Sequence, residues 1–494
     1  MQFTSLFFFL FLSLVLLGYL LIPRKARCIW LLAASYLFCA SYSLTALFFL
    51  LFSTAVTWAI GLVLRKESPH KKAWLIAGIL LNLGPLFVFK YADFVVRNLN
   101  LLFLRTVQRQ PFDVFTTLIV PVGISFYTFQ VLGYLIDVYR GKIEPEHNPL
   151  SFALFTAFFP KLLQGPIERA DNLLVQIRNI ETIRVWNYDR ITAGAVTILW
   201  GLFQKMVLAD RLGLLVNNVF DNARLWGSVE LILGAVAYTL QIYLDFNGYT
   251  CIAIGSAQIL GFSLMENFIT PYFASSISDF WRRWHVSLSS WFKDYLYIPL
   301  GGSRVSTPRH CFNIMVTMVV SGLWHGASWN FVAWGALHGV YQVAGRLTKP
   351  LRTPLQTKWK VRTQSFSHRF GQKAFTFLLV CFAWIFFRAD GLYNALLYIY
   401  RMVTRWNPWV LFDGSFCVFD GMVGIEIFVL GAGLLLVWAV DALRYRSGQQ
   451  LADWLSQQSL WFRWSVCIVL ILTILVFGEY GISFDSSKFI YLQF

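Results

Sequence analysis

Long apolar runs recur along the chain of 494 residues, and short basic loops separate them. A run of about 20 apolar residues can cross a bilayer as an α-helix, and only helices or closed barrels satisfy the backbone in lipid. The alternating pattern of barrel strands is absent from the sequence. Only 13% of the residues are charged, against about 25% in soluble domains. The sequence therefore predicts an all-α, polytopic membrane protein, expected as a single integral-membrane domain over residues 1–494.

The apolar runs predict about ten transmembrane helices, with additional re-entrant segments. Residues 150–163 are apolar but short and are interrupted by Pro160, so we expect them to be re-entrant. The first run has no charged region before it, which favours a retained helix over a cleaved signal peptide. The expected crossings are residues 3–22, a hairpin over 28–64, then 73–89, 115–136, 191–208, 229–246, 375–387, 422–440 and 464–478.

The net charge of +16 invites a nucleic-acid interpretation, but the basic residues lie in short loops between the apolar runs. That distribution is typical of the positive-inside rule, so we expect a lipid bilayer and no nucleic acid as the partner. Residues 346–373 carry eight Lys or Arg and no acid, which predicts a cytoplasmic segment. The same rule places the N-terminus and the tail, residues 479–494, outside the cytoplasm. The seven Cys form no CxxC, so no metal site or disulfide framework is expected.

His325 lies between two polar, basic stretches, residues 265–310 and 346–373, which are both expected to be cytoplasmic. The chain between them must leave the cytoplasm and return. The apolar part of its first limb, residues 312–323, would reach roughly 18 Å as a helix, whereas the hydrocarbon core is about 30 Å thick. The charge pattern therefore predicts that His325, at the tip, lies near the middle of the bilayer.

Two histidines are candidate catalytic residues, and each follows a tryptophan. Burial favours the neutral imidazole of His325, which is the form that accepts a proton. Gly322 and Gly326 flank it and would let a substrate or a backbone approach closely. His285 could orient a thioester or assist the base; the alternative is an interfacial residue in an aromatic and basic belt. We assign His338 to helix packing.

The basic and aromatic run over residues 281–304 suits a donor that carries phosphate and adenine. Arg and Lys bind phosphate, and Trp stacks on bases. Interfacial Arg and Trp are also common in membrane proteins, so the run alone leaves both readings open. The candidate substrate-binding residues are Trp281, Arg282, Arg283, Trp284, Trp324 and the acid at membrane depth, Asp245.

Five sequence motifs lie in order along the chain. They are Gln164-Gly-Pro-Ile167, Tyr243-Leu-Asp-Phe-Asn-Gly-Tyr249, Asp279-Phe-Trp-Arg-Arg-Trp-His-Val-Ser-Leu-Ser289, Asp294-Tyr-Leu-Tyr-Ile298 with Leu300-Gly-Gly302, and Gly322-Leu-Trp-His-Gly326. Together they resemble the membrane-bound O-acyltransferase (MBOAT) family, and most of all its bacterial branch, which contains AlgI-type alginate O-acetyltransferase subunits and DltB-type D-alanyl transferases. One departure is Thr250-Cys251, where AlgI-like proteins commonly have Ser-Asp.

The resemblance implies helices around a central funnel, with His325 as the catalytic histidine and His285 as the second one. It implies acetyl-CoA as a cytoplasmic donor substrate, no other cofactor, and an acceptor outside the membrane. Residues 489–494 resemble an aromatic motif that carries the acyl group in the related D-alanyl system. We therefore predict that Tyr491 accepts the acetyl group after His325 removes its proton, because a phenol with a pKa of about 10 is a poor nucleophile. The alternative is a tail that lies on the membrane surface.

The resemblance thus implies transfer of acetyl groups across a bacterial inner membrane for O-acetylation of an exported polysaccharide. A periplasmic SGNH-hydrolase-like acetyltransferase and polysaccharide export machinery are the expected partners. Two alternatives stay open: D-alanyl or other acyl transfer from an acylated carrier protein, and a transporter of a polysaccharide or lipid-linked precursor. The glycan is open among alginate, cellulose, peptidoglycan and others.

Overall fold

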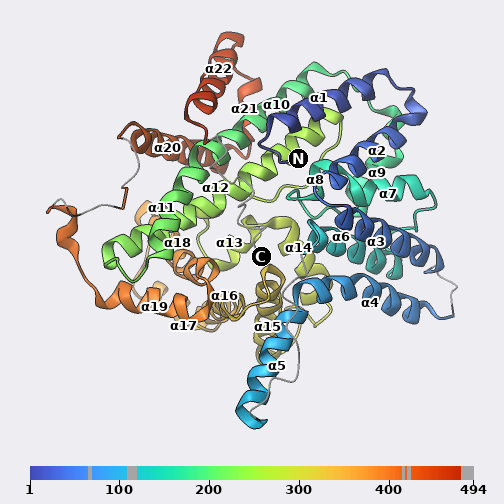
Figure 1. The fold of residues 1–494 in the computed structure, drawn as a ribbon. Coiled ribbons are helices and arrows are strands. Elements are labelled where there is room, and N and C mark those ends of the chain that lie inside the picture. Colours follow the sequence, from blue (N-terminus) through green and yellow to red (C-terminus); the bar gives the residue numbers. More distant parts are fainter. Residues whose placement is uncertain (65–68, 108–119, 414, 416–417, 420–423, 480–494) are drawn as a thin grey trace. The chain divides into compact units, whose positions relative to one another are not determined.

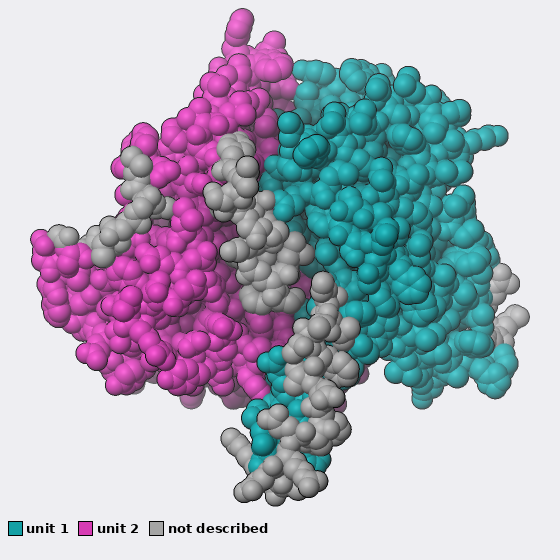
Figure 2. Space-filling model, in the orientation of Figure 1, with its two compact units in different colours: residues 1–198, 250–265 teal, residues 199–249, 266–494 magenta. Residues whose placement is uncertain are grey.

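The computed structural model describes residues 1–64, 69–107, 120–413, 415, 418–419 and 424–479. Within these ranges the chain is helical, with no strand (Figure 1). The all-α prediction is confirmed. The chain forms two compact units, residues 1–198 with 250–265 and residues 199–249 with 266–494 (Figure 2). The single domain over residues 1–494 stays a prediction.

Seven helices of the described residues are long and apolar enough to cross a membrane, so the chain is a multi-pass membrane protein. Three of the roughly ten expected crossings are shorter helices: α1 (Leu6–Leu21), α2 (Arg27–Ala40) and α6 (Ile124–Tyr139). Part of the crossing expected over 115–136 lies outside the described residues. The seven long segments are α3 (Leu44–Val63), α4 (Lys71–Lys90), the continuous run of α10 (Tyr188–Leu202), η4 (Phe203–Ala209) and α11 (Asp210–Asp221), then α12 (Ser228–Leu260), α18 (Phe366–Arg388), α20 (Gly424–Ser447) and α22 (Leu460–Phe477).

Unit 1 packs its first two helices around phenylalanine rings. The ring centres of Phe8 on α1 and Phe38 on α2 are 6.1 Å apart, and Phe159 lies 5.7 Å from Phe38. Such pairs add to the free energy gained by burying the rings. The unit also holds α5 (Ala92–Val107), α9 (Val175–Arg178) and the short turns η1 (Arg24–Ala26), η2 (Ala170–Leu174) and η3 (Ile180–Thr182).

The short apolar segment expected over residues 150–163 is two short helices, α7 (Pro149–Ala157) and α8 (Phe159–Leu162). The helical path breaks at Phe158, where φ is −47° and ψ is 108°. Pro160 follows within the first turn of α8, where its missing N–H costs no helical hydrogen bond. Both helices are buried except at Pro149 and Leu150. The segment is thus short and broken, and its re-entrant course stays a prediction.

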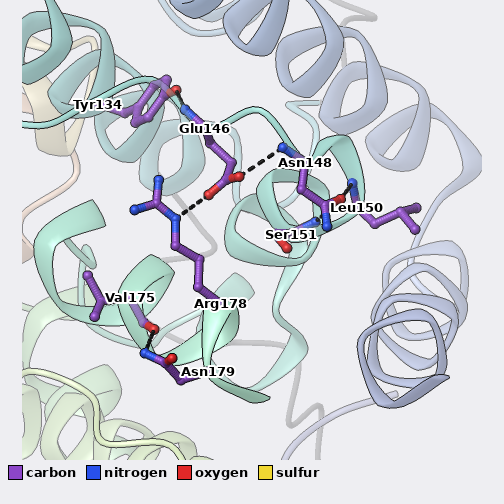
Figure 3. Close-up of polar contacts among 8 residues, drawn as sticks. All are labelled: Tyr134, Glu146, Asn148, Leu150, Ser151, Val175, Arg178 and Asn179. Carbon is purple, nitrogen blue, oxygen red and sulfur yellow. Dashed lines mark hydrogen bonds and ion pairs between the residues drawn. The ribbon is translucent and has the colours of Figure 1, made fainter. Parts of the chain in front are cut away.

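A buried glutamate joins three segments of unit 1 (Figure 3). Glu146 accepts hydrogen bonds from the Asn148 backbone N–H at 2.8 Å and from Arg178 Nε at 2.5 Å. Its own backbone N–H donates to the Tyr134 hydroxyl at 2.8 Å. Asn148 in turn caps α7, since its side-chain oxygen accepts from the N–H groups of its first turn. These contacts fix the start of α7 against α6 and α9.

Unit 2 is built on the hairpin of α15 (Thr307–His325) and α16 (Trp329–Leu347), which packs against α18 and α19 (Gly391–Thr404). Glycines let the two arms touch. A Cβ on Gly322 would lie 2.2 Å from the Phe331 carbonyl oxygen, and one on Gly335 would lie 2.3 Å from the Met318 carbonyl oxygen. The remaining elements are α13 (Ile277–Arg283), α14 (Val286–Phe292), α17 (Lys349–Lys358), α21 (Leu451–Ser456), and the short η5 (Pro271–Phe273), η6 (Lys293–Tyr297) and η7 (Pro408–Leu411).

The first arm of this hairpin is a helix of 19 residues, not the limb of 12 that we expected. The prediction counted only apolar residues. The polar start Thr-Pro-Arg-His is also helical, because Pro308 occupies the first turn, where proline is well tolerated. At 1.5 Å per residue the arm is roughly 28 Å long, close to the thickness of the hydrocarbon core. The arm is therefore not too short to cross the core, and the prediction that its length leaves His325 near the middle of the bilayer is wrong.

α12 is one continuous helix of 33 residues and is longer than the crossing expected over 229–246. Gly248 does not end the helix. A Cβ at this position would lie 2.8 Å from the Gly201 carbonyl oxygen, so the glycine permits close packing between two helices. The helix is roughly 50 Å long.

Candidate active site

His285 stands between α13 and α14 in the left-handed backbone conformation. Its φ is +43° and its ψ is 55°, which is uncommon for a residue other than glycine and marks a constrained position. The neighbouring chain fixes it: the Val286 N–H donates to the Asn267 carbonyl at 2.9 Å, and Ser287 Oγ donates to Asn267 Oδ1 at 2.6 Å. His285 lies outside the seven long apolar helices, and burial lowers its pKa to about 3. It is therefore a neutral imidazole at neutral pH.

His325 is the last residue of α15 and is 3% exposed. Three aromatic rings meet its imidazole edge-on. The ring centres lie at 4.9 Å from Trp324, 5.1 Å from Trp334 and 5.2 Å from Phe387. Trp334 comes from α16 and Phe387 from α18, so the helices that pack on the hairpin also enclose the histidine. A neutral imidazole at this position could accept a proton.

Trp324 lies against both histidines. Its ring centre is 5.9 Å from that of His285 and 4.9 Å from that of His325. The structure therefore brings together the two Trp-His motifs that the sequence singled out, although 40 residues separate the histidines along the chain. The roles assigned to the two histidines stay predictions.

The motif over residues 243–249 supports this site from α12. Phe246 packs edge-on against His285, with ring centres 4.8 Å apart. Asp245 lies instead 2.6 Å from Lys205 Nζ, and Lys205 also lies 2.6 Å from Asp210. Asp245, predicted to bind substrate, thus forms part of a buried ion-pair cluster beside the residue that packs on His285.

A cavity of about 1130 Å³ runs along α15 in unit 2. The residues of α15 that line it extend from His310 to Ser321, eleven residues of helix or roughly 16 Å. Ser321 lies one helical turn before His325. Lys293 and Arg346 also line the cavity, and so do Lys349 and Arg352 of α17. The cavity therefore joins basic side chains at the open end of the hairpin to the vicinity of the histidine.

The tryptophans and arginines predicted to bind substrate occupy different places. Trp281 lines the cavity. Trp284 is fully buried among aromatic rings, including Trp384 at 5.0 Å. Arg283 pairs with Asp279 at 3.0 Å. Arg282 is exposed, and its Nε donates to the Ser278 carbonyl at 3.3 Å. Neither arginine is among the cavity residues.

The cavity cations Arg346, Lys349 and Arg352 were missed as binding residues. These cations belong to the basic stretch over residues 346–373, which we interpreted only as a signal of orientation in the membrane. Their spacing of three residues, close to one helical turn, was the available signal that they share a face. His310 was also not among the candidate residues. It lies on α15, lines the cavity and is hydrogen-bonded to the Tyr297 hydroxyl at 2.7 Å.

Comparison with known proteins identifies the family of the chain. Residues 144–387 match the family described as "MBOAT, membrane-bound O-acyltransferase family". The chain is 39% identical over 424 residues to "Probable alginate O-acetylase AlgI" of Pseudomonas aeruginosa, covering 83% of this chain and 75% of that protein. It is 33% identical over 437 residues to "Peptidoglycan O-acetyltransferase" of Helicobacter pylori, covering 81% and 79%.

A more distant similarity covers less of the chain. "Teichoic acid D-alanyltransferase" of Streptococcus thermophilus is 29% identical over 230 residues, covering 44% of this chain and 55% of that protein. The matched family region contains both histidines, Trp324 and the cavity residues. The chain is an acyl-transfer enzyme that belongs to the membrane-bound O-acyltransferase family.

Proposed function

We propose that this enzyme takes acetyl groups from cytoplasmic acetyl-CoA and supplies them for O-acetylation of an exported bacterial polysaccharide. The names of two similar proteins, an alginate O-acetylase and a peptidoglycan O-acetyltransferase, support acetyl transfer to a glycan. The D-alanyltransferase resembles less than half of the chain.

The cavity that ends near His325 is the observation that carries this proposal. Four cations line it, and Arg and Lys are the usual partners of phosphate. Trp281 supplies an aromatic wall, and Met318 and Ile314 supply an apolar one. Such a cavity suits a long ligand with phosphates at one end and a thioester at the other. The basic stretch also predicts that the opening faces the cytoplasm.

The chemistry that we propose for His325 is general base catalysis. The neutral imidazole removes the proton of the acceptor hydroxyl as its oxygen attacks the thioester carbonyl. A C–O bond forms, the C–S bond breaks, and the proton passes to the departing sulfur to give the free thiol. His285, also neutral, would orient the thioester. Trp324, packed on both rings, would hold the histidines in place.

We propose Tyr491 as the first acceptor, with a periplasmic SGNH-hydrolase-like partner completing transfer to the glycan. Tyr491 lies outside the described residues. The last described residue, Glu479, is anchored to unit 2: its N–H donates to the Met206 carbonyl at 3.1 Å, and its carboxylate lies 3.4 Å from Arg211. The tail therefore starts from a fixed point. Placement of both termini in the periplasm of a bacterial inner membrane is part of the same proposal.

The test is acetyl transfer by the purified enzyme in lipid nanodiscs, with labelled acetyl-CoA as donor. His325→Ala should abolish transfer while binding of acetyl-CoA persists. Arg352→Gln should weaken binding about tenfold, and the effect should shrink at high salt. Arg362→Gln, in the same basic stretch but outside the cavity, is the matched control. If the enzyme transfers an acyl group from an acylated carrier protein but not from acetyl-CoA, then acetyl-CoA is not its donor and this part of the proposal is wrong.

Tyr491→Phe in cells tests the acceptor separately. The substitution removes only the hydroxyl, so polysaccharide acetylation should fall to the level of His325→Ala. Tyr393→Phe, at an exposed position on α19, serves as the control and should leave acetylation unchanged. Normal acetylation by the Tyr491 variant would rule out this residue as the carrier.

A further inference from the structure

A third histidine, His338 on α16, lies beside the cavity wall and is fully buried. Its Nδ1 accepts a hydrogen bond from Trp281 Nε1 at 3.3 Å. An indole nitrogen can only donate, so Nδ1 must be the acceptor. The neutral ring therefore carries its proton on Nε2. This bond joins α16 to α13 at the one tryptophan of the Asp279–His285 motif that lines the cavity.

Neighbouring rings hold His338 in one orientation. Phe280 stacks on it, with ring centres 6.2 Å apart and an angle of 6° between the planes. Trp334 meets it edge-on at 5.0 Å. Trp334 also meets Trp281 at 5.6 Å and His325 at 5.1 Å. The same packed group thus reaches from the cavity wall to the catalytic histidine.

Helix packing alone does not require a histidine at this position. An aliphatic side chain could fill the space without burying a polar ring, and burial of a polar group is costly unless it is hydrogen-bonded. The bond to Trp281 offsets part of that cost. Its further effect is on Trp281, because the hydrogen bond gives the indole N–H a fixed direction in addition to the ring packing around it.

We propose that His338 is a positioning residue that holds the Trp281 indole against the cavity, and so sets how tightly the enzyme binds its thioester donor. The inference rests on the proposed function, in which this cavity holds acetyl-CoA. Trp281 contacts the donor, whereas His338 acts only through Trp281.

The experiment measures the kinetics of acetyl transfer from acetyl-CoA for three single variants. His338→Leu removes the ring nitrogen that accepts the hydrogen bond. Trp281→Phe removes the indole N–H that donates it, while keeping an aromatic ring. Each should raise KM for acetyl-CoA about tenfold and change kcat by less than about threefold. His338→Asn places an amide oxygen near the position of Nδ1, so it should keep KM within about threefold of the wild-type value.

The double variant Trp281→Phe with His338→Leu gives the sharper result. If the two residues act through one bond, the double variant should show the same tenfold rise as either single variant. A hundredfold rise would mean that they act independently and would overturn the inference. A KM as high in His338→Asn as in His338→Leu would also overturn the inference. That result is expected if the imidazole only fills space, because the amide oxygen would then not restore the wild-type KM.

The two proposals fail in different ways. A wild-type enzyme that neither binds nor uses acetyl-CoA overturns the proposed function. A wild-type enzyme that uses acetyl-CoA, with KM unchanged in Trp281→Phe, overturns only the role of His338. If His338→Leu does not fold, Trp281→Phe and His338→Asn still decide the matter, because a raised KM in the first and a normal KM in the second are both required.

Discussion

At the scale of single residues, Gly322 shows how a correct pattern can carry an incomplete explanation. The sequence indicated that a glycine beside His325 would let a substrate or a backbone approach closely. The structure shows that a backbone does so, because the Phe331 carbonyl of α16 occupies the space where a Cβ would stand. The glycine therefore sets the geometry of the hairpin that ends in His325.

Gly322→Ala should destabilise the protein by about 1–3 kcal/mol, the usual cost of overpacking. The added Cβ would lie 2.2 Å from a backbone oxygen, which cannot move without shifting α16. Gly431→Ala on α20 is the control, since nothing lies within 4 Å of its Cβ. That change should be neutral or stabilise the helix by about 0.5–1 kcal/mol. Thermal unfolding in detergent measures both, and equal midpoints would contradict the packing argument.

The burial of His285 predicts a pH-dependent stability. Its folded pKa of about 3 lies below the ordinary value of 6.5, so below pH 6.5 the unfolded chain binds a proton that the folded chain does not. Acidification therefore favours unfolding, by roughly 2 kcal/mol between pH 6.5 and 5. His285→Asn, which tolerates a positive φ, should lose correspondingly less stability over that range. The same loss in both proteins would show that this imidazole does not titrate on unfolding.

At the scale of helices, the sequence predicted which segments exist better than where they end. The hairpin and the broken segment of α7 and α8 were predicted from charge and from proline. The start of α15 was missed because polar residues in a first helical turn carry no apolar signal. The continuity of α12 was missed because Gly248 resembles a helix end until its partner Gly201 is known. The burial of Trp284 and the exposure of Arg282 also depend on contacts with residues distant in the sequence, which the local pattern does not reveal.

Lys205 on η4 should be among the most sensitive charged residues. It lies 2.6 Å from each of two buried carboxylates, Asp210 and Asp245. Lys205→Met leaves both without a cation and should cost about 3–5 kcal/mol of stability. Arg97→Gln is the control: Arg97 is 61% exposed and pairs with Asp93, and such pairs contribute about 1 kcal/mol at most. If unfolding measurements give the same loss of stability for the two variants, the buried cluster is not a stabilising unit.

At the scale of the whole molecule, the charge distribution predicts an orientation that the helices alone leave undetermined. The seven long apolar helices of the described residues establish a multi-pass membrane protein but do not say which face is cytoplasmic. The basic stretch over 346–373 predicts that its own side is cytoplasmic. In the proposed function, the three cations of this stretch that line the cavity would then face the compartment of the acetyl-CoA donor.

Cysteine labelling tests this orientation. In a variant without the seven native cysteines, Thr357→Cys on α17 should react with an impermeant maleimide only after the inner membrane is permeabilised. Asn222→Cys, between α11 and α12, should react in cells whose inner membrane is intact, because one crossing separates it from the cytoplasmic end of α12. The reverse pattern would place the cavity opening on the outer face and would contradict cytoplasmic acetyl-CoA as the donor.

The division of α12 between the two units has a consequence for biogenesis. Unit 1 comprises residues 1–198 and 250–265, so its last segment leaves the ribosome only after 51 residues of the other unit have been made. Gly194 and Gly255 meet within unit 1, where a Cβ on either would lie less than 3 Å from the backbone of the other. The first unit therefore lacks this contact while its own first 198 residues are being inserted. We expect an incompletely packed intermediate until α12 is made, and truncations that end before residue 250 should be degraded rather than accumulate as a folded half.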